Sequence, residues 1–250
     1  MLEALAFLTV IPVGSRARTP SRTTLIAFPL VGLLVGAMWA VVGWAGHALW
    51  GSLPAAALVL IADAGLTGAL HLDAVADVAD GWASRKPAEE ALAVMRDPAI
   101  GAIGAGMLGA TLLVRWSLLA ALIARAAPAG HWWVLAVAPV IGRCAMVWTL
   151  QWAGNRPAGD APRPPSLTDA WAGAGWRIAA GVAGLGGVVA LEAGGVRGVL
   201  ALALAGAAAW GAAAWARRRF GRVVGDVVGA AGMAAEVVAL AVLSAGSHLH

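Results

Sequence analysis

Three aspartates at helical spacing are the most chemically distinctive feature of the sequence. Asp73, Asp77 and Asp80 lie within residues 71–81, where most of the intervening residues are alanine or valine. On an α-helix these positions fall within about 60° of one another, so the three carboxylates share one face. Carboxylates that lie close together and partly out of water repel one another, and a hard divalent cation relieves this repulsion. We therefore expect a Mg²⁺ site that also binds substrate phosphates, with a solvated helix face as the alternative.

Arg96 and Asp97 form a second candidate site, immediately before Pro98. Proline disfavours helical backbone at the preceding residue, so we expect the helix that starts near Pro87 to break at Asp97. The next membrane span then begins with Asp97 near its N-terminus. Helix N-termini bind anions, and Arg96 can add a fork of donors to a phosphate. The alternative is a helix cap beside a cytoplasmic arginine.

Asp226 opens the last apolar segment, within the glycine-rich residues 221–229. The glycines permit a close approach of the backbone to a ligand. Asp226 begins its helix on the same side of the membrane as the three aspartates, so it either completes the metal site or caps the helix.

Two further charged residues lie inside apolar segments, where a charge is costly unless it is paired. Glu236 is about three turns deeper than Asp226, and Arg143 is either its partner or a phosphate ligand. We expect Asp63 to be a buried hydrogen-bonding acid and not a metal ligand. His71 lies nearly opposite the aspartate face, which by itself predicts a hydrogen-bonding core residue.

Apolar helices must position these residues. The chain has 250 residues, 61% hydrophobic and 12% charged, and this charged fraction is about half that of a soluble domain. Its long apolar runs lack the alternation of strands and have the length of membrane spans. We predict an all-α, polytopic integral membrane bundle of about seven transmembrane helices, forming one catalytic domain over residues 1–250. The expected spans are residues 25–50, 54–72, 99–123, 131–152, 172–191, 199–215 and 227–243.

The basic residues divide unequally between the two sides of this arrangement. Of the 17 Lys and Arg residues, Arg125 and Arg197 face out, and Arg115 and Arg143 lie within spans, which leaves 13 on the side of the N-terminus. The positive-inside rule therefore places the N-terminus in the cytoplasm. We expect a multi-pass inner-membrane protein, surrounded by the lipid bilayer, with its active site facing the cytoplasm.

The net charge of +4 does not indicate a nucleic-acid partner. The basic residues lie at helix ends and form no compact basic face with aromatic platforms. The single cysteine, Cys144, lies in an apolar segment without a partner for an intramolecular disulfide, so we interpret it as a packing residue. The oligomeric state stays open, with a homo-oligomer among the alternatives.

Motifs over most of the chain resemble those of the cobalamin synthase family, the adenosylcobinamide-GDP ribazoletransferases. Residues 7–13 resemble the family's F-L-T-x-x-P-V, residues 28–32 its F-P-L-x-G, and residues 67–81 its T-G-x-x-H-L-D-G-L-A-D-x-x-D-G. Residues 95–104 resemble M-[RK]-D-S-x-x-G-x-x-G, and residues 225–230 resemble the end of T-G-D-x-x-G-A. The sequence departs from the family pattern at Ala74, Ala93, Pro98, Val224 and Met233, none of which belongs to the aspartate triad.

The resemblance implies a phosphoryl transfer. A ribose hydroxyl of α-ribazole, or of its 5′-phosphate, attacks the cobinamide phosphate of adenosylcobinamide-GDP, and GMP leaves. Positioning and charge neutralisation supply most of the catalysis in such reactions. The resemblance implies Mg²⁺ binding by Asp73, Asp77, Asp80 and Asp226, a hydroxyl-orienting role for His71, and substrate binding by Arg96, Asp97 and Arg143.

Two other function classes are alternatives. A CDP-alcohol phosphotransferase also gathers aspartates around a divalent metal in a membrane, but its D-G-x-x-A-R opening is replaced here by the stretch from Asp73 to Asp77. An ion-coupled secondary transporter tends to place its acids near the membrane midplane, often within repeated units. Here the acids gather toward one membrane face, and the sequence shows no internal repeat.

Overall fold

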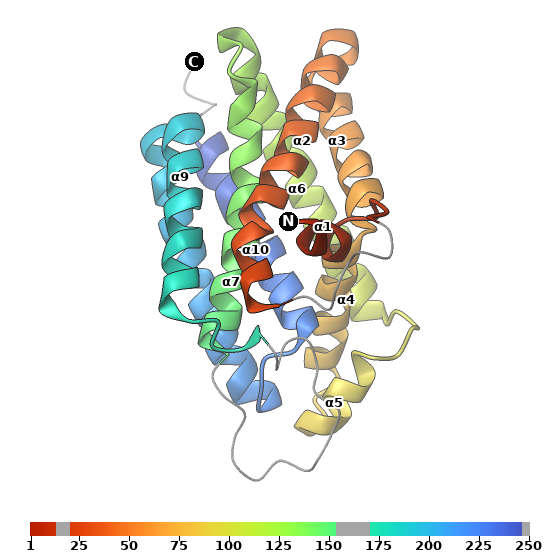
Figure 1. Cartoon of the computed structure of the whole chain (residues 1–250). Helices are drawn as coiled ribbons and strands as arrows, with labels where there is room; N and C mark the ends of the chain where they lie inside the picture. Colours follow the sequence, from red (N-terminus) through yellow and green to blue (C-terminus); the bar gives the residue numbers. More distant parts are fainter. Residues whose placement is uncertain (14–20, 154–170, 247–250) are drawn as a thin grey trace.

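The computed structural model describes residues 1–13, 21–153 and 171–246, and within these ranges the chain is helical without strands (Figure 1). The predicted all-α fold is therefore confirmed. Four of the arginines assigned to the cytoplasm (Arg16, Arg18, Arg156, Arg163) lie outside the described residues. The elements, in chain order, are α1 (Leu2–Leu8), η2 (Arg22–Ala27), α2 (Phe28–Trp50), α3 (Ser52–Thr67), α4 (Leu70–Ala83), α5 (Ala88–Val94), α6 (Ala102–Ala129), η3 (Trp132–Ala136), α7 (Val137–Trp152), α9 (Trp176–Phe220) and α10 (Gly225–Ser244).

Five described helical segments are long and apolar enough to cross a membrane, which makes this a multi-pass membrane protein. The bent pair of α3 and α4 adds a sixth if the pair is counted as one span. The five segments are Arg22–Trp50, α6, Trp132–Trp152, α9 and α10.

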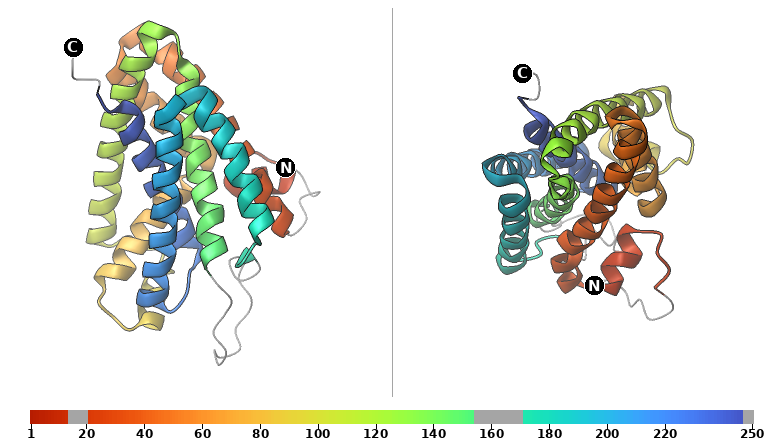
Figure 2. Two further views of the ribbon diagram at one scale, coloured as in Figure 1. Left: turned by 90° about the vertical axis from the view of Figure 1, so that its left-hand side faces the viewer. Right: turned by 90° about the horizontal axis from the view of Figure 1, so that it is seen from above.

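The helix α9 is 45 residues long, about twice the length that a bilayer requires. Its backbone leaves helical geometry at Gly195, with φ 58° and ψ −148°, and Figure 2 shows the chain reversing direction so that two limbs lie side by side. A Cβ at Gly198 would lie 2.0 Å from the carbonyl oxygen of Ala190, so only glycine allows this approach of the limbs. The limbs match the predicted spans 172–191 and 199–215, whereas the total of seven spans stays a prediction.

Small residues at helix contacts allow the bundle to pack closely. A Cβ at Gly36 would lie 2.4 Å from the Cα of Ala136, and one at Gly32 would lie 2.7 Å from the carbonyl oxygen of Pro139. The backbone of α2 therefore rests directly on η3 and α7, because small residues let helices approach closely. The central helix is α7, which is buried almost throughout and packs against α2, α9 and α10.

The predicted span 54–72 is wrong at its C-terminal end. Helix α3 ends at Thr67, both Gly68 and Ala69 have left-handed backbone (φ 63° and 56°), and α4 starts at Leu70 at 89° to α3. Left-handed backbone is uncommon at alanine, so the surrounding packing imposes this bend. The aspartate motif therefore lies on a helix of its own, which packs against α6 and α10 at the lower end of the bundle in Figure 1.

Candidate functional site

The aspartate face of α4 meets the first turn of α10. Asp73 is exposed, Asp77 and Asp80 are half-buried, and Asp226 of α10 is close enough to interact electrostatically with Asp73 and Asp77. Partial burial, together with the negative charges of Asp73, Asp226 and Asp80, raises the pKa of Asp77 to about 6. Helix α4 is not itself among the five candidate spans. The structure thus brings Asp226 to the predicted aspartates, and the surplus of negative charge is what a divalent cation would relieve.

The acids do not form a closed cage for an ion. In the described part of the chain, no three His, Cys, Asp or Glu side chains converge as the ligands of one metal would. Mg²⁺ commonly keeps several of its waters and needs one or two protein carboxylates beside the phosphates of its substrate. An open group of acids with Asp73 on α4 and Asp226 on α10 therefore has the chemistry of a site that a metal and a phosphorylated substrate would share.

Asp80 has different surroundings from the other acids. Its Oδ2 accepts a hydrogen bond from the Gly101 amide and its Oδ1 accepts one from the Gly104 amide, both at 2.7 Å. A Cβ at either glycine would lie within 2.5 Å of the carboxylate, so the contact requires glycine at both positions. The carboxylate therefore caps the N-terminus of α6 and ties α4 to it.

This cap changes the setting of the second predicted site. Helix α6 begins at Ala102, not beside Asp97, and the carboxylate of Asp80 binds the amide at its N-terminus, where the sequence predicts a phosphate. The predicted break before Pro98 is confirmed, since α5 ends at Val94. Asp97 is exposed and accepts a hydrogen bond from the Ala99 amide at 2.9 Å, which stabilises the connecting turn. Its role in substrate binding stays a prediction.

Arg96 remains part of the site. Its side chain is exposed, and its positive charge interacts with Asp226. This places the arginine beside the group of acids, and its binding of a substrate phosphate stays a prediction. Arginine presents a planar fork of donors that matches a phosphate, so it can share an anionic substrate with a metal ion.

A cavity of about 240 Å³ opens between the first turns of α4 and α10. Neither helix has a side-chain hydrogen bond at its N-cap, so the first amides of both helices keep donor capacity. His71 lines the cavity at 4% exposure, and its Nε2 has no hydrogen-bond partner in the described part of the chain. The expectation of a hydrogen-bonded core histidine is therefore wrong for this atom. The described lining residues are Phe7, Phe28, Leu70, His71, Asp73, Ala74, Met146, Leu150, Trp171, Gly225, Asp226, Val228 and Gly229.

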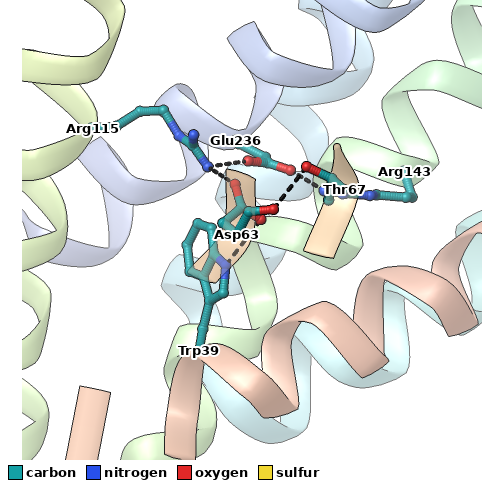
Figure 3. A network of polar contacts seen from close by, with 6 residues as sticks. All are labelled: Trp39, Asp63, Thr67, Arg115, Arg143 and Glu236. Atoms are coloured by element: carbon teal, nitrogen blue, oxygen red, sulfur yellow. Dashed lines mark hydrogen bonds and ion pairs between the residues drawn. The ribbon is translucent and has the colours of Figure 1, made fainter. Parts of the chain in front are cut away.

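A charged network lies deeper in the bundle, among α2, α3, α6, α7 and α10 (Figure 3). One Nη2 atom of Arg115 bonds Asp63 at 2.9 Å and Glu236 at 3.0 Å, and Arg143 bonds the second carboxylate oxygen of Glu236. The indole of Trp39 donates to Asp63 at 3.2 Å, and the Arg115 guanidinium lies over its ring. Two arginines and two acids balance in charge, as buried ions in a membrane protein require.

The network confirms two predictions and adds one residue. Asp63 is a buried hydrogen-bonding acid, and Arg143 is the partner of Glu236. The Arg143 side chain is 1% exposed, so little of its surface is open to a substrate. Its direct contact with a substrate phosphate stays a prediction. Arg115 joins the two acids. The sequence shows that this arginine lies in an apolar segment, where it needs a partner, but it does not show which acids Arg115 meets.

Comparison with known proteins gives a consistent match along the chain. The family described as Cobalamin-5-phosphate synthase matches residues 1–244. A relative named adenosylcobinamide-GDP ribazoletransferase, from Roseiflexus sp. (strain RS-1), is 36% identical over 97% of this chain and 88% of its own length. Proteins of the same name from Herpetosiphon aurantiacus and Sinorhizobium medicae are 33% and 36% identical, over 98% and 97% of this chain and 96% and 94% of theirs. No solved structure matches the chain.

Proposed function

The chain belongs to the cobalamin-5-phosphate synthase family of transferases, and we propose that it joins a ribazole to the cobinamide phosphate of adenosylcobinamide-GDP. The hydroxyl oxygen of a ribose, in α-ribazole or in α-ribazole 5′-phosphate, forms a new bond to the phosphorus of the cobinamide phosphate. The bond between this phosphorus and the oxygen that links it to GMP breaks, and GMP leaves with that oxygen. Membership in this family sets aside the transporter and the CDP-alcohol phosphotransferase. The observation that carries the proposal is the meeting of α4 and α10, which gathers Asp73, Asp77 and Asp226 beside a cavity.

We assign Mg²⁺ to this group of acids. Asp73 and Asp77 of α4 and Asp226 of α10 would hold it, and the bound ion would neutralise the diphosphate and stabilise the leaving GMP. Arg96, beside Asp226, would bind phosphate oxygens. His71 would orient the attacking hydroxyl through its unpartnered Nε2. Asp80 belongs to the predicted ligand set, but two backbone amides already bind its carboxylate, so we also assign it the role of holding α4 on α6.

The reaction can be tested in proteoliposomes with adenosylcobinamide-GDP, α-ribazole 5′-phosphate and Mg²⁺, following GMP release and the corrinoid product. We expect turnover by the wild type and by Glu90→Gln, an exposed acid on α5, and loss of turnover in Asp77→Asn. Absence of GMP release with either form of ribazole would refute the reaction. Unchanged Mg²⁺-dependent turnover by Asp77→Asn would refute the placement of the metal.

We further propose that the acids face the cytoplasm from the inner membrane. The native Cys144 is buried, so cysteines introduced at exposed positions can be labelled against a silent background. In intact spheroplasts, a membrane-impermeant maleimide should label Glu192→Cys but not Lys86→Cys, which should react only after lysis. The reverse pattern would invert the proposed topology.

A further inference from the structure

The cavity beside the acid group has a wall of aromatic rings that the proposed reaction does not explain. Phe7 and Phe28 stack with centroids 6.1 Å apart, and Trp171 meets both edge-on at 5.1 and 5.8 Å. The three rings come from α1, from the start of α2 and from the segment before α9, so the tertiary fold assembles this wall. Aromatic faces and edges in this arrangement favour contact with another flat ring.

Most of the other described lining residues are also apolar. Ten of the thirteen described lining residues are apolar side chains or glycine, and the other three are His71, Asp73 and Asp226. The described lining residues include two carboxylates and no lysine or arginine, so these side chains favour an uncharged ring over a phosphate. At about 240 Å³ it lies below the ~300–1,000 Å³ of pockets for drug-sized ligands, a volume that suits one small ring system better than a corrin ring.

The unpartnered Nε2 of His71 indicates that a ligand completes this cavity. A buried polar atom without a partner is rare in folded proteins, and each one calls for an explanation. Asp73 and Asp226 line the same cavity and belong to the proposed metal site. A ring seated against the aromatic wall would therefore hold any attached sugar next to His71 and the acids.

We propose that this cavity binds the base of the ribazole and selects an apolar bicyclic base, of the benzimidazole type, over a purine. This inference rests on the proposed function and names the subsite for its second substrate. Among the described lining residues, His71 is the single unpartnered buried side-chain group, and the carboxylates of Asp73 and Asp226 belong to the proposed metal site. The polar groups and extra ring nitrogens of a purine would therefore find few side-chain partners here. Leaving one such group unpaired corresponds to a preference of roughly 10- to 100-fold.

The test compares KM values for the two substrates. Phe7 is half-buried on α1, so Phe7→Ala removes part of the wall while sparing the bundle core. We expect its KM for α-ribazole 5′-phosphate to rise roughly tenfold, its KM for adenosylcobinamide-GDP to stay unchanged, and its preference over the adenine nucleotide to fall. Phe7→Leu should recover part of the effect. Leu2→Ala, an exposed change on the same helix, should match the wild type.

A second variant fills the cavity without opening its wall. Leu70 lines the cavity and is 41% exposed, so Leu70→Trp can place bulk there without disturbing the core. Equilibrium binding of α-ribazole alone, measured by calorimetry on purified protein, should be weakened by both variants. Equal changes in both KM values, or unchanged ribazole binding in both variants, would overturn the cavity assignment while wild-type turnover still supported the reaction. Absence of wild-type turnover would refute the proposed function, and the binding measurement would still decide whether the cavity takes the base.

Discussion

Replacing Asp80 with asparagine separates a structural role from a metal-binding one. The carboxylate accepts two backbone hydrogen bonds at 2.7 Å, one on each oxygen, at the N-terminus of α6. An amide keeps one acceptor and turns its NH₂ group toward the other amide donor. The change therefore removes at least one charge-assisted bond, about 1.5–3 kcal/mol of folding free energy. For a chain of this length that corresponds to a fall in Tm of roughly 3–12 °C.

The control is Asp77→Asn, an isosteric change with the same loss of charge on the same helix. Burial and three neighbouring carboxylates raise the pKa of Asp77, so its ionised form is disfavoured in the folded protein. Neutralising it should leave the melting temperature unchanged or raise it. Thermal unfolding of detergent-purified protein in Mg²⁺-free buffer at neutral pH compares the two variants. Equal melting temperatures for Asp80→Asn and Asp77→Asn would refute the cap.

The remaining predictions concern the buried network, the helix contacts and the metal. Arg115→Met removes the shared partner of Asp63 and Glu236, so it should lower the free energy of unfolding by about 3–5 kcal/mol. Arg143→Met should lower it less, because Glu236 keeps its bond to Arg115. Equal losses for the two variants would contradict the shared arrangement. Gly36→Ala should destabilise the fold by about 1–3 kcal/mol, since its Cβ would lie 2.4 Å from the Cα of Ala136. Gly109→Ala, which meets no neighbouring atom within 4 Å, should have no such cost. A chelator should abolish GMP release and added Mg²⁺ should restore it; activity that survives exhaustive chelation would argue against the metal.

Local pattern was enough for several features of this protein. The apolar run lengths predicted an all-helical membrane bundle, because a span needs its own continuous apolar segment whatever its neighbours are. The spacing of Asp73, Asp77 and Asp80 placed them on one face, since helical periodicity is a property of the local backbone. Pro98 marked the break before α6 for the same reason. The pairing of Glu236 with Arg143 was one of the two alternatives that the sequence offered for Arg143, because each buried charge needs a partner.

Contacts between distant segments were decided by packing. The bend at Gly68 and Ala69 has no proline to announce it, and it arises where α4 turns to lie against α6 and α10. That turn brings Asp80 to the amides of α6, and it brings Asp73 and Asp77 to Asp226. The three aspartates Asp73, Asp77 and Asp80 thus share one motif but have different partners. The sequence by itself therefore determined which residues are candidates for chemistry and which face of their helix they share. Only the tertiary structure decided which candidate meets a helix end and which ones meet across two helices, because those contacts depend on how helices far apart in the chain fit together.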